Sequence, residues 1–144
     1  MYKKIVVGTD GSTTAAQAVD HAAGLAKSFD AELHVVSVHK PLTQLASLEM
    51  ASLAGVIQES DQAVRQELQR LLDELGARLE GHGVKVVTQM GAGDPADVLC
   101  DAGADADLIV LGSRGMTGVK RLLGSVPNKV SHQAPCSVLI VHTG

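Results

Sequence analysis

The chain has 144 residues, the size of one domain spanning residues 1–144, and 45% of them are hydrophobic, enough for a buried core. With 12 basic and 16 acidic residues, its net charge of −4 argues against nucleic acid as a partner. No apolar run is long enough for a signal peptide or a membrane span, so we expect a cytoplasmic protein with no membrane partner.

Five short apolar runs, rich in β-branched residues, recur along the chain. Most are continuous rather than alternating, which is typical of strands buried on both faces of a parallel sheet. The predicted strands are residues 5–7, 33–38, 84–87, 108–111 and 138–141.

Four helical patterns separate these runs. Ser12 is a candidate N-cap for a helix that ends near Ser28. A second helix begins after Pro41 and ends near residues 81–83. Asp94 followed by Pro95 opens a third helix, and the fourth covers 125–133. The apolar face of the second helix is predicted from Val64, Leu68, Leu71, Leu72, Leu75 and Leu79.

The alternation of strands and helices predicts a doubly wound α/β fold, a five-stranded parallel sheet with helices on both faces. Such sheets bind ligands outside the carboxyl ends of their strands. Here those ends are residues 9–11, the stretch after Val38, 90–94 and 112–118. Residues 39–56 are the segment we expect to be most flexible.

The segment from Gly112 to Ser125 is rich in glycine and hydroxyl side chains. Glycine lets backbone N–H groups approach an anion, and a helix that follows favours phosphate at its N-terminus. No acidic residue occurs from Gly112 to the last residue, whereas four basic residues do. These features predict a phosphate-binding loop; the alternative is a loop whose glycines only allow turns and whose cations are solvated.

Other motifs give weaker signals. Gly91, Gly93 and Ala96 fit a loose dinucleotide fingerprint, but Asp94 would repel a pyrophosphate there, so we interpret residues 90–96 as a turn and a capped helix. The two cysteines, Cys100 and Cys136, have no partner at metal-binding spacing and are expected to be buried, reduced thiols. No P-loop, nucleophile elbow or metal-ligand pattern occurs, so the sequence predicts neither catalytic nor metal-binding residues.

Three segments together resemble the universal stress protein family, over nearly the whole chain. The start, KKIVVGTDGS, resembles that family's first strand and turn, and GSVPNKVSHQAPCSVLIV its final helix and strand. The glycine-rich loop is similar to the ATP-binding signature Gly-x2-Gly-x9-Gly-Ser/Thr. In this chain, however, only eight residues, 116–123, separate Gly115 from Gly124.

The resemblance implies a fold like that of adenine nucleotide hydrolases, with strand order 3-2-1-4-5, and a role in the stress response. It implies that ATP is bound, with Mg or Mn carried on the phosphates. The binding residues it implies are Gly8, Thr9, Asp10, Val38, Gly112, Arg114, Gly115, Gly124, Ser125 and Val126. It also implies a homodimer formed through the last strand, about residues 136–142.

Three alternatives remain open from the sequence. The short spacer keeps open a dimeric interaction protein that binds no nucleotide. A slow ATPase is a further possibility, although no general base or Walker-type lysine is recognisable. Asp10 can hold a ribose or an exocyclic amine, or it can be a plain turn residue, because Asp-Gly favours turns in any protein.

Overall fold

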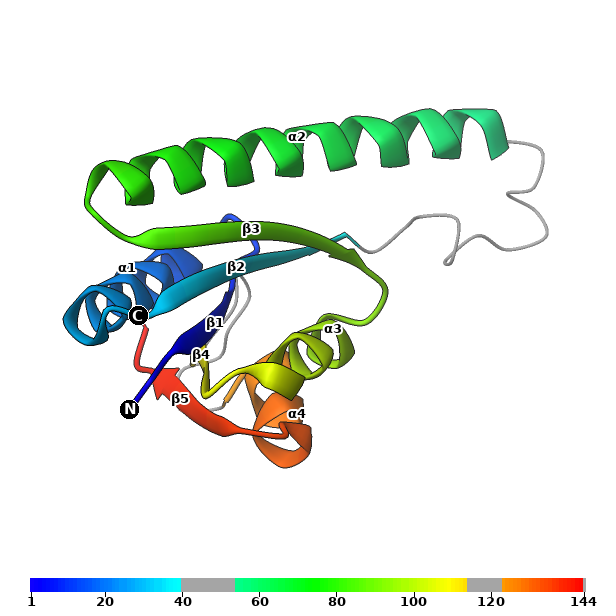
Figure 1. Cartoon of the computed structure of the whole chain (residues 1–144). Helices are drawn as coiled ribbons and strands as arrows, with labels where there is room; N and C mark the ends of the chain where they lie inside the picture. The colour runs from blue at the N-terminus through cyan, green and yellow to red at the C-terminus, as the bar shows by residue number, and fades with distance from the viewer. Residues whose placement is uncertain (40–53, 114–122, 144) are drawn as a thin grey trace.

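The computed structural model describes residues 1–39, 54–113 and 123–143. Within these residues strands and helices alternate along the chain (Figure 1). The strands are β1 (Lys4–Gly8), β2 (Glu32–His39), β3 (Lys85–Ala92), β4 (Leu108–Gly112) and β5 (Ser137–Val141). The helices are α1 (Thr13–Phe29), α2 (Ala54–Gly81), α3 (Pro95–Ala102) and α4 (Ser125–Gln133), with a short 3-10 helix, η3 (Gly103–Asp105), after α3.

The strands of the described residues form one sheet in the order β3-β2-β1-β4-β5, with every neighbouring pair parallel. The predicted fold class and strand order are therefore confirmed. Gly8 at the end of β1 is level with Val36, so β2 continues beyond β1 to His39. The central strands β1, β2 and β4 are buried, whereas β3 and β5 at the edges are partly exposed.

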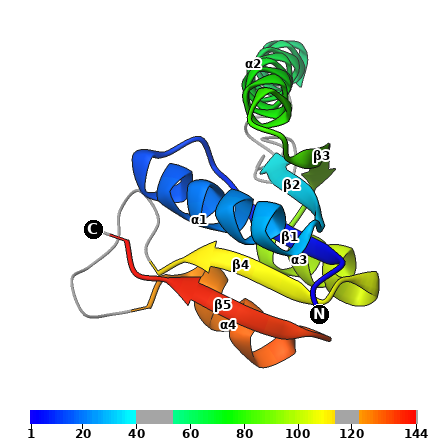
Figure 2. The same ribbon diagram turned by 60° about the vertical axis from the view of Figure 1, so that its left-hand side comes forward.

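Helices α1 and α2 lie on one face of the sheet and α3 and α4 on the other (Figure 2), and the sheet separates two hydrophobic clusters. Ile5 and Val7 of β1 face the cluster beneath α1 and α2, which we call the α1–α2 cluster. Val6, between them, faces the cluster beneath α3 and α4, which we call the α3–α4 cluster. This alternation follows from the two-residue period of a strand, which sends successive side chains to opposite faces.

Local signals explain where the helices begin. Ser12 caps α1, because its hydroxyl oxygen accepts a hydrogen bond from the Ala15 N–H at 3.1 Å. Asp94 caps α3 in the same way, accepting from the Asp97 N–H at 3.1 Å, and Pro95 follows at the first helical position. Both predicted N-caps are confirmed.

Several expectations need correction. Strand β3 extends to Ala92, so Met90 and Gly91 belong to a strand and not to a turn. Edge strands carry mixed polar and apolar residues, which hid the length of β3 from a search for apolar runs. The two cysteines are free thiols, as expected, but only half-buried.

The limits of the predicted flexible segment and the apolar face of α2 also change. His39 ends β2, and residues 54–56 begin α2; residues 40–53 lie outside the described part of the chain. Val64 is 45% exposed and Leu71 is 38% exposed, whereas Leu72 and Leu79 are buried. The buried side of α2 is therefore rotated away from Val64.

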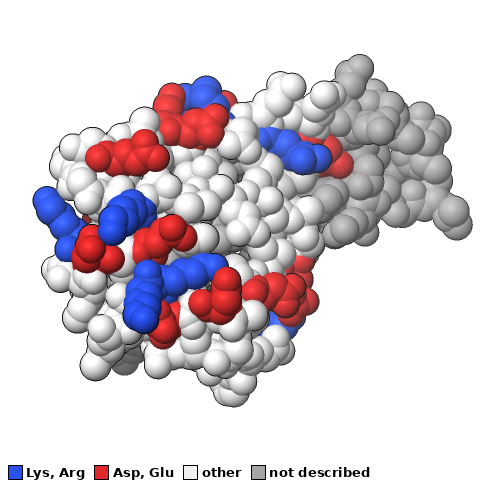
Figure 3. All heavy atoms as spheres, viewed as in Figure 1, with Lys and Arg blue, Asp and Glu red and all other residues white. Residues whose placement is uncertain are grey.

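Basic and acidic side chains lie next to one another on the face shown in Figure 3. Many are paired: Arg70 with Glu67 and Glu74, Arg78 with Asp20, and Lys85 with Asp30.

Among the described residues, no helix is both long enough and apolar enough to cross a membrane.

Candidate functional site

The winding direction of the chain reverses between β1 and β4. From β1 the chain passes through α1 to β2 on one side, and from β4 it passes through α4 to β5 on the other. The two connections diverge and leave space beyond the carboxyl ends of these strands, where open α/β sheets bind their ligands. The candidate site is built from the residues that follow β1 and β4.

The turn after β1 is fixed by its own side chains. The Asp10 carboxylate accepts a hydrogen bond from the Ser12 N–H at 2.9 Å, and the Thr9 hydroxyl oxygen accepts from the Gly11 N–H at 3.2 Å. Gly11 has a φ of 81°, which favours glycine. Asp10 therefore acts as a turn residue. Its side chain is also exposed, so a ligand can still reach the carboxylate.

The end of β4 is held against both α1 and the residues after β5. A Cβ on Gly112 would lie 3.1 Å from Thr143 Cγ2 and 3.6 Å from the Thr14 carbonyl oxygen, so a side chain there would be crowded. The Ser113 N–H donates to the Val141 carbonyl at 2.8 Å, and the Thr143 N–H donates to the Ser113 hydroxyl oxygen at 3.0 Å. Gly112 thus brings the end of β4 close to the first turn of α1.

The N-terminus of α4 lies beside this strand end. The Gly124 N–H donates to the Ser113 carbonyl at 2.9 Å, which fixes the start of the helix. Gly124 is the N-cap residue and supplies no capping side chain, and no acidic residue occurs in the first turn. Pro127 has no N–H, so the backbone amides of Ser125 and Val126 are the donors at this terminus. These amides and the helix dipole favour an anion.

Val38 and Gly8 have roles that their sequence context did not reveal. Val38 is paired with Gly91 of β3, beyond the end of β1, and its side chain packs against the α3–α4 cluster. A Cβ on Gly8 would lie 3.0 Å from Leu111 Cδ2 and 3.1 Å from Leu99 Cδ1. Close packing against Leu111 of β4 and Leu99 of α3 therefore explains why position 8 is a glycine, without any contact to a ligand.

The structure brings Thr9, Asp10, Gly112, Gly124 and Ser125 to the carboxyl ends of β1 and β4, as the sequence predicts. Val126 contributes a backbone amide there, while its side chain packs against the α3–α4 cluster. Arg114 and Gly115 lie outside the described residues.

Lys129, a basic residue of the segment that follows Gly112 and contains no acid, lies away from the start of α4. Lys129 of α4 forms ion pairs with Asp94 at 2.9 Å and Asp97 at 3.3 Å, both at the start of α3. Hydrogen bonds to these two carboxylates raise the pKa of Lys129. Its charge therefore stabilises the contact between α3 and α4 rather than the start of α4.

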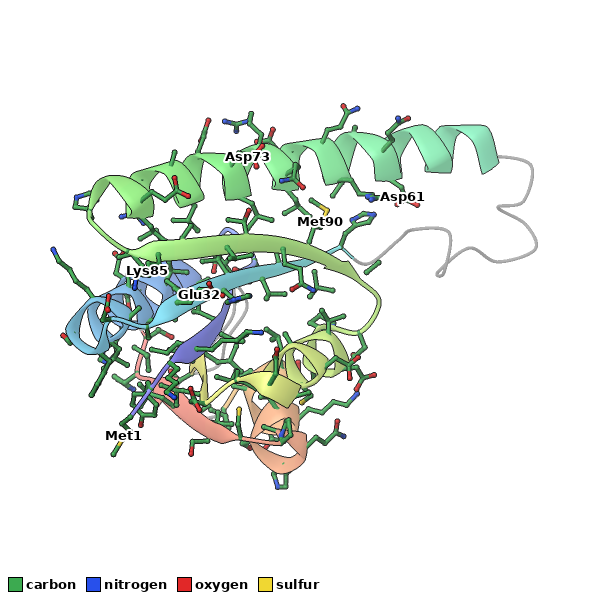
Figure 4. The ribbon with its side chains drawn as sticks, viewed as in Figure 1. Met1, Glu32, Asp61, Asp73, Lys85 and Met90 are labelled. Carbon is green, nitrogen blue, oxygen red and sulfur yellow. The ribbon has the colours of Figure 1, made fainter. Side chains whose placement is uncertain are left out.

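Sequence reasoning missed several buried polar residues near the strand ends, among them Ser37 of β2, which is 2% exposed. Thr143 is fully buried and carries no motif, so no signal identified it. Asp61 of α2 is 8% exposed and points toward the sheet, near Met90 (Figure 4). It could have been noticed, because it lies seven residues before Leu68 and eleven before Leu72, on the buried side of the helix.

Comparisons with known proteins agree with this architecture. The family model described as the universal stress protein family matches residues 1–142. Universal stress protein MJ0531 of Methanocaldococcus jannaschii is 36% identical over 149 residues, which cover 98% of this chain and 82% of that protein.

Solved structures give the same result. UspA from Lactobacillus plantarum superposes with a TM-score of 0.85 over 98% of each chain, and at 24% identity this likeness shows the fold alone. A universal stress protein crystallised in complex with cAMP is 31% identical, with a TM-score of 0.69 over 99% of this chain and 98% of that one. The chain belongs to the universal stress protein family.

Proposed function

We propose that the chain is a regulatory binding module of the stress response that holds an adenine nucleotide, ATP or a relative such as AMP or cAMP. The phosphates would lie at the N-terminus of α4, and the nucleoside near Asp10 and the backbone of Val38. Arg114 and Gly115, outside the described residues, would complete the phosphate site. The relative crystallised with cAMP supports a nucleotide in this family.

The proposal rests on one observation, the hydrogen bond that fixes the start of α4. The bond from the Gly124 N–H to the Ser113 carbonyl holds the helix terminus beside the carboxyl end of β4, and no acid of the first turn opposes an anion. The exposed Asp10 carboxylate suits the uncharged end of a nucleotide, since beside phosphate it would repel.

A divalent cation, Mg or Mn, would be carried on the phosphates of ATP. The described residues contain no group of three or more His, Cys, Asp and Glu side chains that could hold a metal ion. The ligands of the metal would then be phosphate oxygens and water, an arrangement common for Mg²⁺ at nucleotide sites.

Thermal unfolding tests the proposal. Mg-ATP, AMP and cAMP are added separately, and a ligand at 100 times its dissociation constant stabilises the folded state by about 2.7 kcal/mol. We expect at least one of the three to raise the unfolding temperature. If none does at millimolar concentration, nucleotide binding is refuted and the dimeric, nucleotide-independent alternative is favoured.

A pair of variants locates the phosphates. In Ser125→Asp the new carboxylate lies at the start of α4, where it suits the helix dipole but repels phosphate. In Gln133→Glu the same charge change is made at the other end of α4. We expect the first variant to fold and to lose nucleotide binding, and the second to retain it. Equal affinities for the two variants would place the phosphates elsewhere.

We also propose a homodimer formed through β5. This strand ends the sheet, so one row of its backbone groups has no neighbouring strand within the described residues. Its side chains from Val138 to Val141 are only partly buried. An apolar edge strand readily pairs with a second copy of itself.

A further inference from the structure

A pocket of about 170 Å³ lies between α1 and α2, on the face of the sheet opposite to α3 and α4. Leu68, Leu71, Leu72 and Leu75 of α2 form one wall, and Ala16 and Val19 of α1 lie across from them. Thr9, Gly11, Ser12 and Ser37 lie at the strand ends that complete the lining.

The two helices leave this space because they rest on different strands. Helix α1 packs on β1 and β4, whereas α2 packs on β3 and β2, and Figure 2 shows the two helices diverging. The leucines of α2 share one side of the helix, since they are spaced by three and four residues. Opposite them α1 has a small residue, Ala16, that leaves the space unfilled.

The pocket is open to the surface at one end, and leucine side chains of α2 face it. Leucine atoms that face such a space lose attractive contacts without gaining hydrogen bonds from water. A ligand that fills the space would restore these contacts, which favours an apolar occupant.

Two residues meet where the pocket reaches the surface. Leu71 is 38% exposed, and a Cβ on Gly11 would lie 3.6 Å from Leu71 Cδ1. A side chain in place of Gly11 would therefore contact Leu71 and narrow the space between the β1–α1 turn and α2. Gly11 and Leu71 therefore lie at the surface end of the pocket.

We propose that this pocket binds a small uncharged molecule built on one apolar ring. A leucine-lined cavity of about 150 Å³ is known to stay dry and to bind benzene, so the volume suits one ring and excludes a long acyl chain. A charged ligand would lose its hydration among leucines. Arg78 at the edge of the lining does not demand an anion, because it is paired with Asp20 at 3.2 Å.

The pocket is separate from the proposed phosphate site, although a nucleoside at Asp10 would lie beside Thr9 and Gly11 of the lining. The start of α4, where phosphates are proposed, follows a strand end and packs with the opposite face of the sheet. Among the described residues, Thr9 is shared between the lining of the pocket and the predicted nucleotide contacts. Competition between toluene and a nucleotide therefore tests whether the two ligands bind at the same time.

Toluene is a suitable probe, and leucine methyl resonances report its position. We expect saturable shifts of the methyl groups of Leu68, Leu71, Leu72 and Leu75 in the full chain. Seven heavy atoms in an apolar site correspond to a dissociation constant on the order of 1 mM or tighter. Methyl groups of Leu99 and Leu111, on the other face of the sheet, should not shift.

A matched pair of variants closes the pocket or leaves it open. Leu71→Trp places a large side chain at the surface end of the pocket, where a partly exposed residue tolerates it. Val64→Trp makes the same kind of change at another exposed position of α2, outside the lining. We expect toluene to bind at least tenfold more weakly to the first variant and unchanged to the second. Ala16→Leu, which fills the space from α1, should repeat the loss.

Two results would overturn the proposal. One is the absence of saturable methyl shifts in the wild-type chain. The other is competitive displacement of toluene by AMP or ATP, because the pocket would then hold part of the nucleotide. If toluene still binds when the nucleotide is present at saturating concentration, the pocket is a separate ligand site. This conclusion holds whether or not the proposed nucleotide function is correct.

Discussion

His39 Nε2 lies 3.7 Å from the Oδ1 atom of Asp61, and both residues are buried. His39 is the last residue of β2, and Asp61 lies in the N-terminal part of α2, so the pair links elements separated by residues 40–53. The Nε2 atom has no hydrogen bond within the described structure. The carboxylate is therefore the charged group that faces this nitrogen at the end of the sheet.

Replacing Asp61 by asparagine should destabilise the fold. The substitution keeps the size of the side chain but removes the charge that faces a ring nitrogen without a hydrogen bond, and a buried polar group left uncompensated costs about 1–3 kcal/mol. Urea unfolding measures the difference. Asp73→Asn is the control, because Asp73 is an exposed residue of the same helix whose partner is Gln69. Equal stability of the two variants would show that the His39–Asp61 pair contributes nothing.

Asp107 makes stability depend on pH in acid. Its Oδ2 accepts hydrogen bonds from the Lys3 N–H at 2.8 Å and the Lys4 N–H at 3.0 Å, which lower the pKa of the carboxyl in the folded protein. A pKa lower in the folded than in the unfolded state gives stability that is present above the unfolded pKa. That stability is lost as the pH falls through the folded pKa.

Asp107→Asn should therefore be less stable than the wild type at neutral pH, and the difference should shrink below the ordinary pKa of aspartate. Unfolding temperatures recorded from pH 7 down to pH 2 test this. Asp101→Asn, an exposed substitution on α3, serves as the control. A difference that stays constant with pH would contradict the assigned role of the Asp107 carboxylate.

Two glycines should respond to alanine in opposite directions. A Cβ on Gly91 of β3 would lie 2.5 Å from Val98 Cγ1, and valine has few rotamers with which to yield. Gly91→Ala should cost about 1–3 kcal/mol, as overpacking does. Gly24 in α1 has no atom within 4 Å of such a Cβ, so Gly24→Ala should stabilise by roughly 0.5–1 kcal/mol. The midpoints of denaturant unfolding measure both differences. If Gly91→Ala leaves the stability unchanged, the packing explanation for Gly91 is refuted.

The proposed dimer can be tested by charging either edge of the sheet. Lysine on an edge strand opposes strand pairing between molecules. Ser137→Lys carries this charge on β5, and Gln89→Lys carries it on β3, both at exposed positions. Sedimentation at micromolar concentration should find a dimer for the wild type and for Gln89→Lys, and a monomer for Ser137→Lys. A monomeric wild type would exclude the dimer.

Apolar runs and capping residues were sufficient to predict the alternation of strands and helices in a parallel sheet, whereas the strand order came from the family resemblance. Strands β1, β2 and β4 are buried on both faces, so continuous runs such as Ile5–Val7 identify them, and Ser12 and Asp94 identify the starts of α1 and α3. The length of β3 was not predictable in this way. Gln89 and Gly91 lie on an edge strand, where no apolar run is required.

The candidate site was only partly predictable. Glycines and hydroxyl residues indicated the start of α4 as the place of the proposed phosphate site, because such a site would depend on backbone amides that a local sequence reveals. The bonds between Ser113 and Thr143 join residues 30 positions apart, and no local pattern predicts them. The same limit applies to His39 and Asp61, and to the pocket, which depends on the divergence of two helices.

The interior is divided into two clusters, and this division affects how the sequences of such a family can diverge. Ile5 and Val7 pack on one side of β1 and Val6 on the other, so the clusters share strands but not side-chain contacts. Substitutions more than about 7–10 Å apart that share no partners usually have additive effects on stability. The helices over one cluster can therefore accumulate changes while the opposite side of the sheet keeps its packing, and the two proposed sites can change at independent rates.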